Sequence, residues 1–388
     1  MSFQDLVDSI NKTSSALASS FKTPDPHPLP PNLLSDRNNL LSAIHSLQLL
    51  LLPPTEALLH HTNLPIYSLC ALRWLSHFDI FTAVPLEGSI TYTDLAKARN
   101  VPLDTLTRII RLATTSGWFH ETSPTSITHS PLSHHVATSD IARGTLRYQL
   151  EINLFASFHQ VEATKATITS PSPTAPPSSN PSPPPPKTAF NLAFSTPLNS
   201  ATWASTSPTW SATYSLLMQG FQANPAFSLS HILANYPFAS LPAGSTVLDL
   251  GGNTGALGVA LARSFPNIGR VVVQDLPLPV AEGRANLPLE VQGRVEFQEQ
   301  DFLARNQMAG VDVVVLRFIL HDWPDEEAGR ILEGVRPVLR PGGRVVVFDV
   351  VKDEGGGEQG DWVKKRLGRN MDVLMMVMFG ARERGRGE

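Results

Sequence analysis

The sequence predicts an α/β protein whose C-terminal half is a doubly wound parallel sheet and whose N-terminal half is helical. From residue 245 onward, short valine-rich runs alternate with helical segments, which is typical of a parallel sheet covered by helices. A glycine-rich turn follows the first run, and helical spacing of apolar residues dominates the first half of the chain. The expected strands are 247–250, 271–274, 295–298, 311–316 and 344–349, with helices between them at 257–264 and 325–339.

A winged-helix unit is expected between residues 90 and 130. Thr91 and Asp104 are candidate N-caps of two short helices, and Gly117 is a candidate stop for the second. Two short strands then complete the order of helix, helix and two-stranded wing. The expected elements are helices at 92–99 and 105–116 and strands at 118–121 and 126–129, preceded by helices at 36–52 and 65–77.

The charge balance argues against nucleic acid as a partner of this unit. Between Thr91 and Asp140 four cationic side chains face four acidic ones, whereas binding to phosphates requires a cationic surplus. The whole chain has 30 Lys and Arg against 34 Asp and Glu, a net charge of −4. This balance also argues against a general membrane-surface binder. We therefore expect a dimerisation role for the winged helix, and a DNA-binding regulator is a less favoured alternative.

The chain of 388 residues is long enough for two or three domains. We expect a flexible N-terminus at 1–35, a helical winged-helix dimerisation domain at 36–150, a helical connector at 151–240 and a catalytic domain at 241–388. Within the connector, residues 171–187 hold nine prolines in seventeen positions and predict an exposed loop. This loop is either a tolerated insertion or a ligand for a proline-binding partner.

Cysteine usage and the N-terminal sequence favour a cytoplasmic protein. Cys70 is the single cysteine, which excludes an intrachain disulfide and a multi-cysteine zinc site. The first 22 residues lack the apolar run of a secretory signal, and the longest apolar run, 373–379, is too short to span a bilayer. We therefore expect a soluble protein without a membrane partner.

The first expected strand leads into the glycine loop GGNTG at residues 251–255. Glycine allows a ligand to approach the backbone closely, and open α/β sheets bind ligands at the carboxyl ends of their strands. Asp249, Asp275 and Asp301 come at the ends of the first three strands in order. A carboxylate after the second strand can accept both hydroxyls of a ribose, and one after the third can accept from an adenine amino group, with Phe302 against the ring. This order favours S-adenosylmethionine. A nicotinamide oxidoreductase is a less favoured alternative, because it would prefer G-x-G-x-x-G.

Five blocks of the chain resemble the plant caffeate-type and fungal polyketide-type O-methyltransferases. They are LDLGGNTG, VVQDLP, EQDFL, LRFILHDWPD and PGGRVVVFDVV, in this order and spacing, and the ILHDWPD block is particularly specific. The resemblance extends into the winged helix through ALRWLSHFDIFTAVP and THSPLSHH, and covers most of residues 40–385 apart from the proline tract. It implies a Rossmann-like S-adenosylmethionine methyltransferase sheet behind an N-terminal winged-helix dimerisation domain. It also implies a homodimer that methylates a phenolic hydroxyl of a small aromatic, polyketide-like secondary metabolite.

The resemblance further implies roles for individual residues. His321 would be the general base, with Asp349 and Glu383 flanking its imidazole. A phenol has a pKa of about 10, like tyrosine, so at neutral pH it needs a base to become a good nucleophile. The phenolate would then attack the sulfonium methyl in line, and no metal is needed. The implied cofactor residues are Gly251, Gly252, Asp275, Asp301, Phe302 and Arg317.

Two departures from the family pattern are visible. Asn253 stands where the family often has another glycine, and we expect this change to be tolerated. The family continues for a few dozen residues beyond Glu388, through a helix and a final pair of strands that complete the sheet. We therefore expect these C-terminal strands to be missing and the fifth strand to be an edge. Two explanations of this departure remain open. The sequence is incomplete, or the protein is an inactive, shortened homologue that acts as a binding or scaffold subunit.

Overall fold

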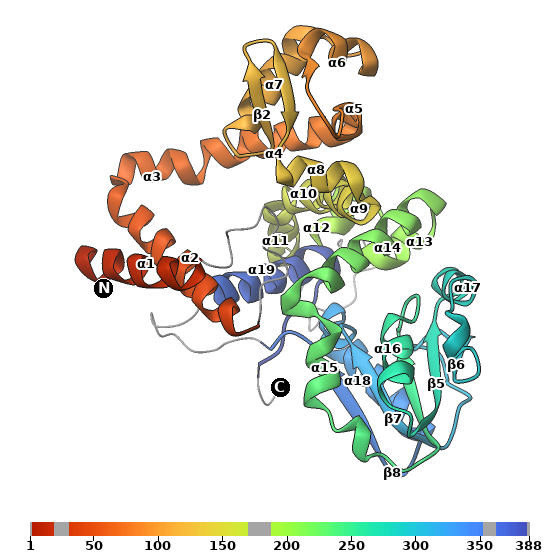
Figure 1. The fold of residues 1–388 in the computed structure, drawn as a ribbon. Helices are drawn as coiled ribbons and strands as arrows, with labels where there is room; N and C mark the ends of the chain where they lie inside the picture. Colours follow the sequence, from red (N-terminus) through yellow and green to blue (C-terminus); the bar gives the residue numbers. More distant parts are fainter. Residues whose placement is uncertain (1, 19–30, 170–187, 352–361, 386–388) are drawn as a thin grey trace.

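The structure, a computed structural model, describes residues 2–18, 31–169, 188–351 and 362–385. Figure 1 shows the large sheet with its helices, a layer of helices beside it, a small winged unit at the top and N-terminal helices at one side. The order of elements predicted from the sequence, a helical half followed by a parallel α/β half, is confirmed. The proline-rich segment 171–187 lies outside the described residues.

The large sheet has the strand order β6-β5-β4-β7-β8, and all neighbouring strands are parallel. The order changes direction between β4 and β7, which creates a switch point where open sheets bind ligands. The expected strands are all present with slightly different ends, but the helix expected over 325–339 ends at Val335. The bounds are β4 Ser245–Leu250, α16 Ala256–Ser264, β5 Ile268–Asp275, α17 Pro277–Ala285, β6 Val295–Glu299, β7 Val311–Arg317, α18 Asp325–Val335 and β8 Leu339–Phe348, with short turns at Leu320–Asp322 and Arg336–Val338.

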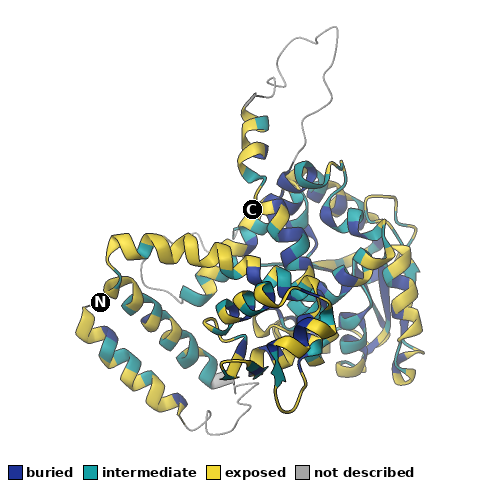
Figure 2. Cartoon of the chain, turned by 90° about the horizontal axis from the view of Figure 1, so that it is seen from above, coloured by how far each residue is buried: buried dark blue, intermediate teal, exposed yellow. Residues whose placement is uncertain are grey.

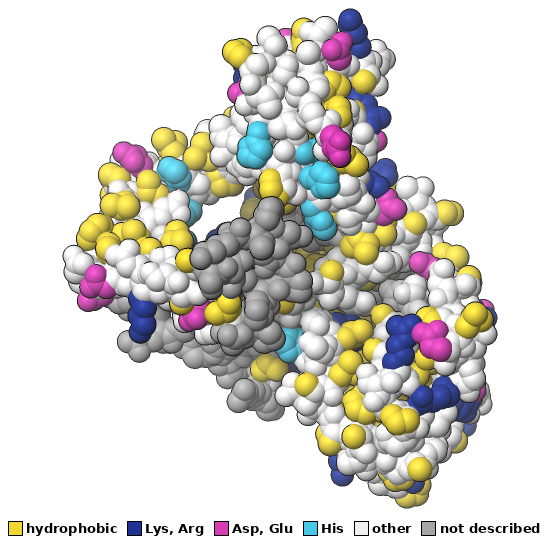
Figure 3. Space-filling view, viewed as in Figure 1, with side chains coloured by type: hydrophobic (Ala, Val, Ile, Leu, Met, Phe, Trp, Pro, Cys, Tyr) yellow, Lys and Arg dark blue, Asp and Glu magenta, His cyan; other side chains and the backbone are white. Residues whose placement is uncertain are grey.

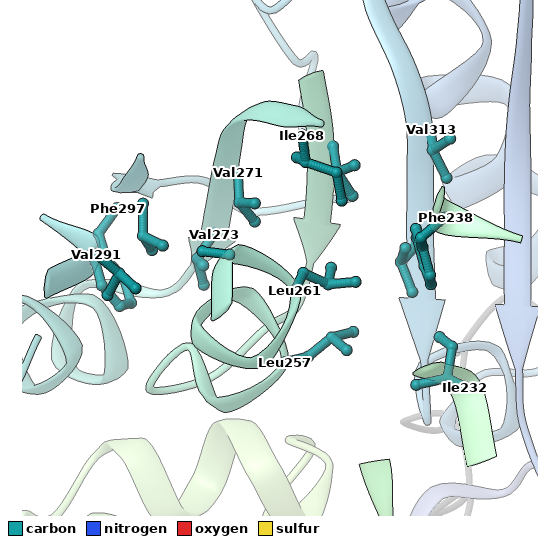
Figure 4. Packing of buried hydrophobic residues seen from close by; sticks show 14 of the residues in the cluster. Ile232, Phe238, Leu257, Leu261, Ile268, Val271, Val273, Val291, Phe297 and Val313 are labelled. Atoms are coloured by element: carbon teal, nitrogen blue, oxygen red, sulfur yellow. The ribbon is translucent and has the colours of Figure 1, made fainter. Parts of the chain in front are cut away.

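Apolar side chains cover both faces of this sheet. On one face, Leu257 and Leu261 of α16 belong to the same buried cluster as Val271 and Val273 of β5 (Figure 4). On the other face, Ile331 of α18 belongs to a second buried cluster with residues of β4, β5 and β7. Strands that are buried on both faces are continuous apolar runs in sequence. This burial explains why the sequence located the strands correctly.

The winged unit contains an antiparallel sheet of order β1-β3-β2. Thr91 caps α6 as predicted, because its hydroxyl accepts a hydrogen bond from the Asp94 backbone at 3.0 Å. The predicted cap at Asp104 is wrong, because α7 begins before it and leaves Asp104 in the first turn. Gly117 follows α7 with a φ of 76°, as expected of a residue that stops a helix. The bounds are α4 Asn63–His77, α5 Ile80–Ala83, β1 Ile90–Thr91, α6 Tyr92–Arg99, α7 Leu103–Thr114, β2 Phe119–Ser123, β3 Ser126–His129 and α8 Pro131–Thr138.

The N-terminal segment is helical, so the predicted flexible start is wrong for its described residues. Ser2 and Asp5 form a capping box at the beginning of α1. Leu6 and Leu17 are buried, and α1 packs along α2. The polar composition concealed this helix, because its narrow apolar face is stabilised by a neighbouring helix rather than by its own sequence. The bounds are α1 Phe3–Leu17, α2 Pro31–Leu51 and α3 Pro54–His61.

A layer of helices separates the winged unit from the sheet (Figure 1). The last helix, α19, returns into this layer and contacts α12, α10 and α2, so segments from both ends of the chain meet there. None of the helices in the described ranges combines the length and apolarity needed to cross a membrane. The bounds are α9 Asp140–Tyr148, a π-helical turn Gln149–Asn153, α10 Leu154–Ser157, α11 Gln160–Thr169, α12 Ala189–Phe194, α13 Ser200–Ser205, α14 Pro208–Ala223, α15 Leu229–Asn235 and α19 Trp362–Phe379, with 3₁₀ turns at Pro225–Phe227, Phe238–Ser240 and Leu289–Val291.

β8 is the outermost strand of the described sheet on its side, as the sequence predicts. Val345 and Val347 on this strand are exposed, whereas the valines of β4, β5 and β7 are buried. The sheet therefore has one partly uncovered edge, which lies one strand away from the switch point between β4 and β7.

Candidate active site

A cavity of about 670 Å³ opens at the carboxyl ends of β4, β5 and β7, beneath helices α13, α14 and α19. This position is the switch point of the sheet, where open α/β proteins bind ligands. The residues predicted to bind the cofactor and the histidine predicted to be the base therefore line the same cavity. The predicted residues that line the cavity are Gly251, Gly252, Asp275, Asp301, Phe302, Arg317 and His321.

The glycine loop after β4 brings backbone to the wall of this cavity. Gly251 has a φ of 75°, and its N–H donates to the carbonyl of Gln274 at 2.8 Å. A Cβ on Gly252 would lie 2.6 Å from Oδ2 of Asp249, so a larger residue cannot be accommodated there without a shift. Asn253 also adopts a left-handed φ, of 51°, and its side-chain oxygen accepts from the Thr254 N–H at 2.7 Å. Asparagine tolerates this conformation well, which explains why the departure from glycine does not disturb the loop.

Asp275 and Asp301 extend the wall beyond the glycine loop. The two carboxylate oxygens of Asp275 accept hydrogen bonds from the N–H groups of Asn253 and Leu276, each at 2.7 Å. Burial raises the pKa of Asp275, although these two N–H groups lower it. Each oxygen retains a lone pair that can accept from a ligand hydroxyl. Asp301 accepts from the Leu303 N–H at 2.9 Å through one oxygen, and its neighbour Phe302 also lines the cavity.

Asp249 and Arg317 place opposite charges at the base of the cavity. Oδ2 of Asp249 is buried and has no hydrogen-bond partner among the described residues. Burial raises the pKa of Asp249 to about 7, while the charge of Arg317 lowers it. Arg317 donates to the carbonyl of Phe227 at 2.6 Å, but its buried Nε is also unpartnered within the described ranges. Buried polar atoms are normally paired, so these two indicate room for a ligand that carries both an ammonium and a carboxylate.

His321 lies in the short turn after β7. The residue is 5% exposed, and its Nδ1 forms a hydrogen bond of 2.9 Å with Oε1 of Glu383. Phe318, three residues earlier, has a φ of 54° and places its ring 5.5 Å from the imidazole. A bulky residue rarely adopts this backbone conformation. The chain therefore turns sharply between Arg317 and His321, which brings both residues to the same cavity.

Three carboxylates surround the imidazole. Besides Glu383, Oδ1 of Asp322 lies 3.5 Å from Nε2 of His321. Burial lowers the pKa of His321, but the charges of Asp322, Glu383 and Asp349 outweigh this effect and raise it to about 9. Burial raises the pKa of Asp322 to about 7. The turn is therefore a strongly coupled acid–base cluster, which is typical of functional sites.

Asp349 is the third of these carboxylates. Its charge acts on His321, but in the described structure no hydrogen bond joins its carboxylate to the ring. Asp349 follows β8. Burial raises the pKa of its carboxyl group, while the nearby N–H groups of Phe318 and His321 lower it. Asp322 lies nearer the imidazole. The sequence did not single it out, although its place beside His321 in the HDW block was a usable signal.

Glu383 reaches His321 from 62 residues further along the chain. Gly380 turns the chain after α19 with a φ of 68°. The N–H of Glu383 then donates to Oδ1 of Asp372 in α19 at 3.0 Å, and the Glu383 side chain is only 1% exposed. Helix α19 therefore anchors the residue that orients the imidazole.

The remaining wall is aromatic, methionine-rich and, on one side, hydroxyl-bearing. Tyr214, Met218 and Phe221 of α14 line the cavity, whereas Trp203 and Trp210 pack in the neighbouring core. Sequence reasoning missed the other wall residues, because they come from distant helices. These residues include Tyr148, Ser200, Met371, Met375, Met378 and Phe379.

The fold and the cavity together define a Rossmann-like methyltransferase. The profile of the O-methyltransferase domain family matches residues 185–388, more than half of the chain. The O-methyltransferase VdtC of Byssochlamys spectabilis is 33% identical over 364 residues, which are 92% of this chain and 80% of VdtC. The chain therefore belongs to the O-methyltransferase family.

Solved structures share the fold. OxaC superposes with a TM-score of 0.78 at 19% identity, covering 99% of this chain and 90% of OxaC. The complex of LepI with SAM gives a TM-score of 0.74 at 22% identity, covering 99% and 91%. The predicted class, an S-adenosylmethionine-dependent O-methyltransferase, is confirmed, and so is the predicted cofactor.

Proposed function

We propose that this protein transfers the methyl group of S-adenosylmethionine to a phenolic hydroxyl of a small aromatic metabolite, with His321 as the general base. The observation that carries the proposal is the buried hydrogen bond between Nδ1 of His321 and Glu383, at a cavity that the glycine loop also lines. A carboxylate on Nδ1 fixes the tautomer and leaves Nε2 to accept a proton.

The residues around the cavity fit S-adenosylmethionine along its length. The Asp275 carboxylate suits the ribose hydroxyls, and Asp301 with Phe302 suits the adenine. The unpartnered atoms of Asp249 and Arg317 suit the ammonium and the carboxylate of the methionine end. The cofactor, when bound, supplies an electrophilic methyl group. The chain's contribution is to hold it and to exclude water from the space next to His321.

The wall opposite the sheet supports an aromatic substrate. Methionine and aromatic side chains from α14 and α19 form an adaptable apolar surface that suits a flat ring system. On the hydroxyl-bearing side, Tyr148 is hydrogen-bonded to Ser200 at 2.8 Å. Such a wall suits a ring that carries several oxygens. The assembled pair of His321 and Glu383 favours an active enzyme over the alternative of an inactive scaffold subunit.

The direct test is transfer of labelled methyl from S-adenosylmethionine to a panel of polyhydroxylated aromatics. Matched compounds in which the phenol is replaced by a benzylic alcohol serve as controls. We expect label on phenols alone, because a single base with a raised pKa can deprotonate a phenol but not an alcohol. Binding of S-adenosylmethionine without transfer to any phenol would instead support the inactive homologue.

We also propose that the protein is a homodimer formed through its N-terminal helices. The outward faces of α2, α3 and α4 are rich in exposed leucine; Figure 2 shows many exposed residues on the N-terminal helices, and Figure 3 shows hydrophobic side chains among the surface atoms there. A monomer rarely exposes so extended an apolar surface. The two-fold dimer is the commonest oligomer. The exposed residues include Leu50, Leu51, Leu58, Leu59, Leu64, Ile66 and Tyr67.

Light scattering at micromolar concentration is expected to give twice the mass of one chain. Leu58→Glu, at a position 63% exposed, should shift the protein toward monomer and weaken association by about tenfold or more. Leu289→Glu is the matched control, since Leu289 is 84% exposed but lies in the α/β domain. A monomeric parent protein, or equal effects of the two substitutions, would contradict this interface.

A further inference from the structure

We infer that Arg384 is a positioning residue that holds the turn carrying His321 against Glu383. The inference rests on the proposed function, because it concerns the same base. Arg384 follows Glu383 directly, so one short segment forms hydrogen bonds both to the imidazole and to the backbone on either side of it.

The contacts of Arg384 bracket the turn from both ends. Its Nη1 donates to the carbonyl of Leu320 at 2.6 Å, and its Nη2 donates to the carbonyl of Trp323 at 2.9 Å. These two carbonyls immediately precede and follow the pair His321 and Asp322. The planar guanidinium presents donors in a rigid fork, so two acceptors held by one arginine are fixed in relative position. The side chain is 19% exposed, which protects both bonds from solvent.

The turn has few other backbone bonds to fix its shape. The N–H groups of Asp322 and Trp323 donate within the turn to Ile319 and Leu320, at 3.1 and 3.2 Å. Pro324 follows, and proline has no N–H to contribute. A three-residue 3₁₀ turn has poor hydrogen-bond geometry. A donor from outside the turn is therefore an effective way to hold His321 in place.

The segment that carries Arg384 is itself fixed. Ala381 donates from its N–H to Met375 at 3.3 Å, and Glu383 donates to Asp372. Arg384 also forms a parallel β-bridge with Val351, just after β8. The arginine thus connects the end of α19 to the turn after β7 across more than 60 residues of sequence.

Arg382 provides a natural comparison two residues earlier. Both arginines pair with Asp325 at the start of α18, Arg384 with Oδ1 at 2.9 Å and Arg382 with Oδ2 at 3.0 Å. The charge of Asp325 is therefore shared between them. The bonds to the carbonyls of Leu320 and Trp323 belong to Arg384. Separate substitutions of the two arginines therefore distinguish the effect of the backbone hydrogen bonds from the effect of the ion pair with Asp325.

The experiment compares Arg384→Ala, Arg384→Lys and Arg382→Ala in the full-length protein. Arg384→Ala should lower kcat by about tenfold to a hundredfold, because a small displacement of a catalytic group has an effect of this size. The affinity for S-adenosylmethionine, measured by calorimetry, should stay unchanged. Arg384→Lys should remain impaired, because one ammonium cannot reproduce the fork. Added guanidinium should restore part of the activity of Arg384→Ala, and Arg382→Ala should resemble the parent protein.

Two readouts separate positioning from a purely structural role. The acid limb of the pH–kcat/KM curve should move to lower pH in Arg384→Ala, because a displaced imidazole loses its bond to Glu383. The downfield proton resonance of the His321 Nδ1–H, recorded without substrate, should weaken in Arg384→Ala and persist in Arg382→Ala. This resonance tests the inference even if no phenol is methylated. An unchanged resonance and pH limb in Arg384→Ala would overturn it; if that variant does not fold, unchanged readouts in Arg384→Lys would do so.

Discussion

His321→Ala is expected to lower kcat for phenol methylation by about 10²-fold or more, with little change in the affinity for S-adenosylmethionine. The substitution removes the group that accepts the phenol proton, whereas the predicted cofactor residues other than Arg317 lie at the ends of β4, β5 and β6. The residual rate should rise with pH until the substrate itself is ionised, because solvent then supplies the phenolate. Single-turnover kinetics at saturating cofactor measures this step directly.

A second substitution separates loss of the base from loss of structure. His321 is buried against Glu383, so alanine leaves a carboxylate without its partner. His321→Gln keeps a side chain that can donate to Glu383 but cannot act as a base at neutral pH. Both variants should lose activity to a similar extent, while His321→Gln should retain more thermal stability. Near-normal turnover in His321→Gln would exclude the assignment of His321 as the base.

The activity is expected to increase about tenfold per pH unit between pH 6 and the pKa of His321, then to level off. Although burial lowers the pKa of this group, the charges of Asp322, Glu383 and Asp349 raise it to about 9 in the unliganded protein. Only the neutral imidazole can accept the phenol proton, so its fraction limits the rate below that pKa. A cationic sulfonium in the same cavity lowers the pKa, so the limb measured with saturating S-adenosylmethionine should lie between the ordinary value of about 6.5 and 9.

Asp322→Asn tests the origin of the raised pKa. The charge of Asp322 contributes most among the groups that raise the pKa of His321, so its removal should move the limb to lower pH. Glu290→Gln, on an exposed salt bridge with Arg263, is the control and should leave the limb in place. A limb that is identical in Asp322→Asn and the parent protein would show that Asp322 does not govern the base.

The same ionisation affects folding stability. The pKa of His321 is higher in the folded protein than the value of about 6.5 expected when unfolded. Its contribution to stability is therefore complete below the unfolded pKa and is lost as the pH rises through about 9. The conditions that favour the neutral base thus weaken this part of the fold.

The glycine loop, Asp275 and Asp301 could be placed from sequence because they follow recognisable strands. Parallel strands buried on both faces give continuous apolar runs, and their carboxyl ends all meet at one edge. The positions of acids along the chain thus translate into neighbours in space. Helix α1 was not predicted, although its apolar residues recur at helical spacing and Ser2 with Asp5 forms a capping box, because the segment is polar on average; Leu6 and Leu17 are buried there.

The sequence by itself determined the α/β fold, the order of its strands along the chain and the family, because these depend on local periodicity and on short blocks of residues. The tertiary structure decided which acids meet the imidazole. It placed Asp322 against Nε2, brought the charge of Asp349 to bear on His321, and brought Glu383 and Arg384 to the turn from the far end of α19. These contacts join segments up to 64 residues apart. Their geometry depends on how helices and strands pack, and no local pattern in the chain encodes it.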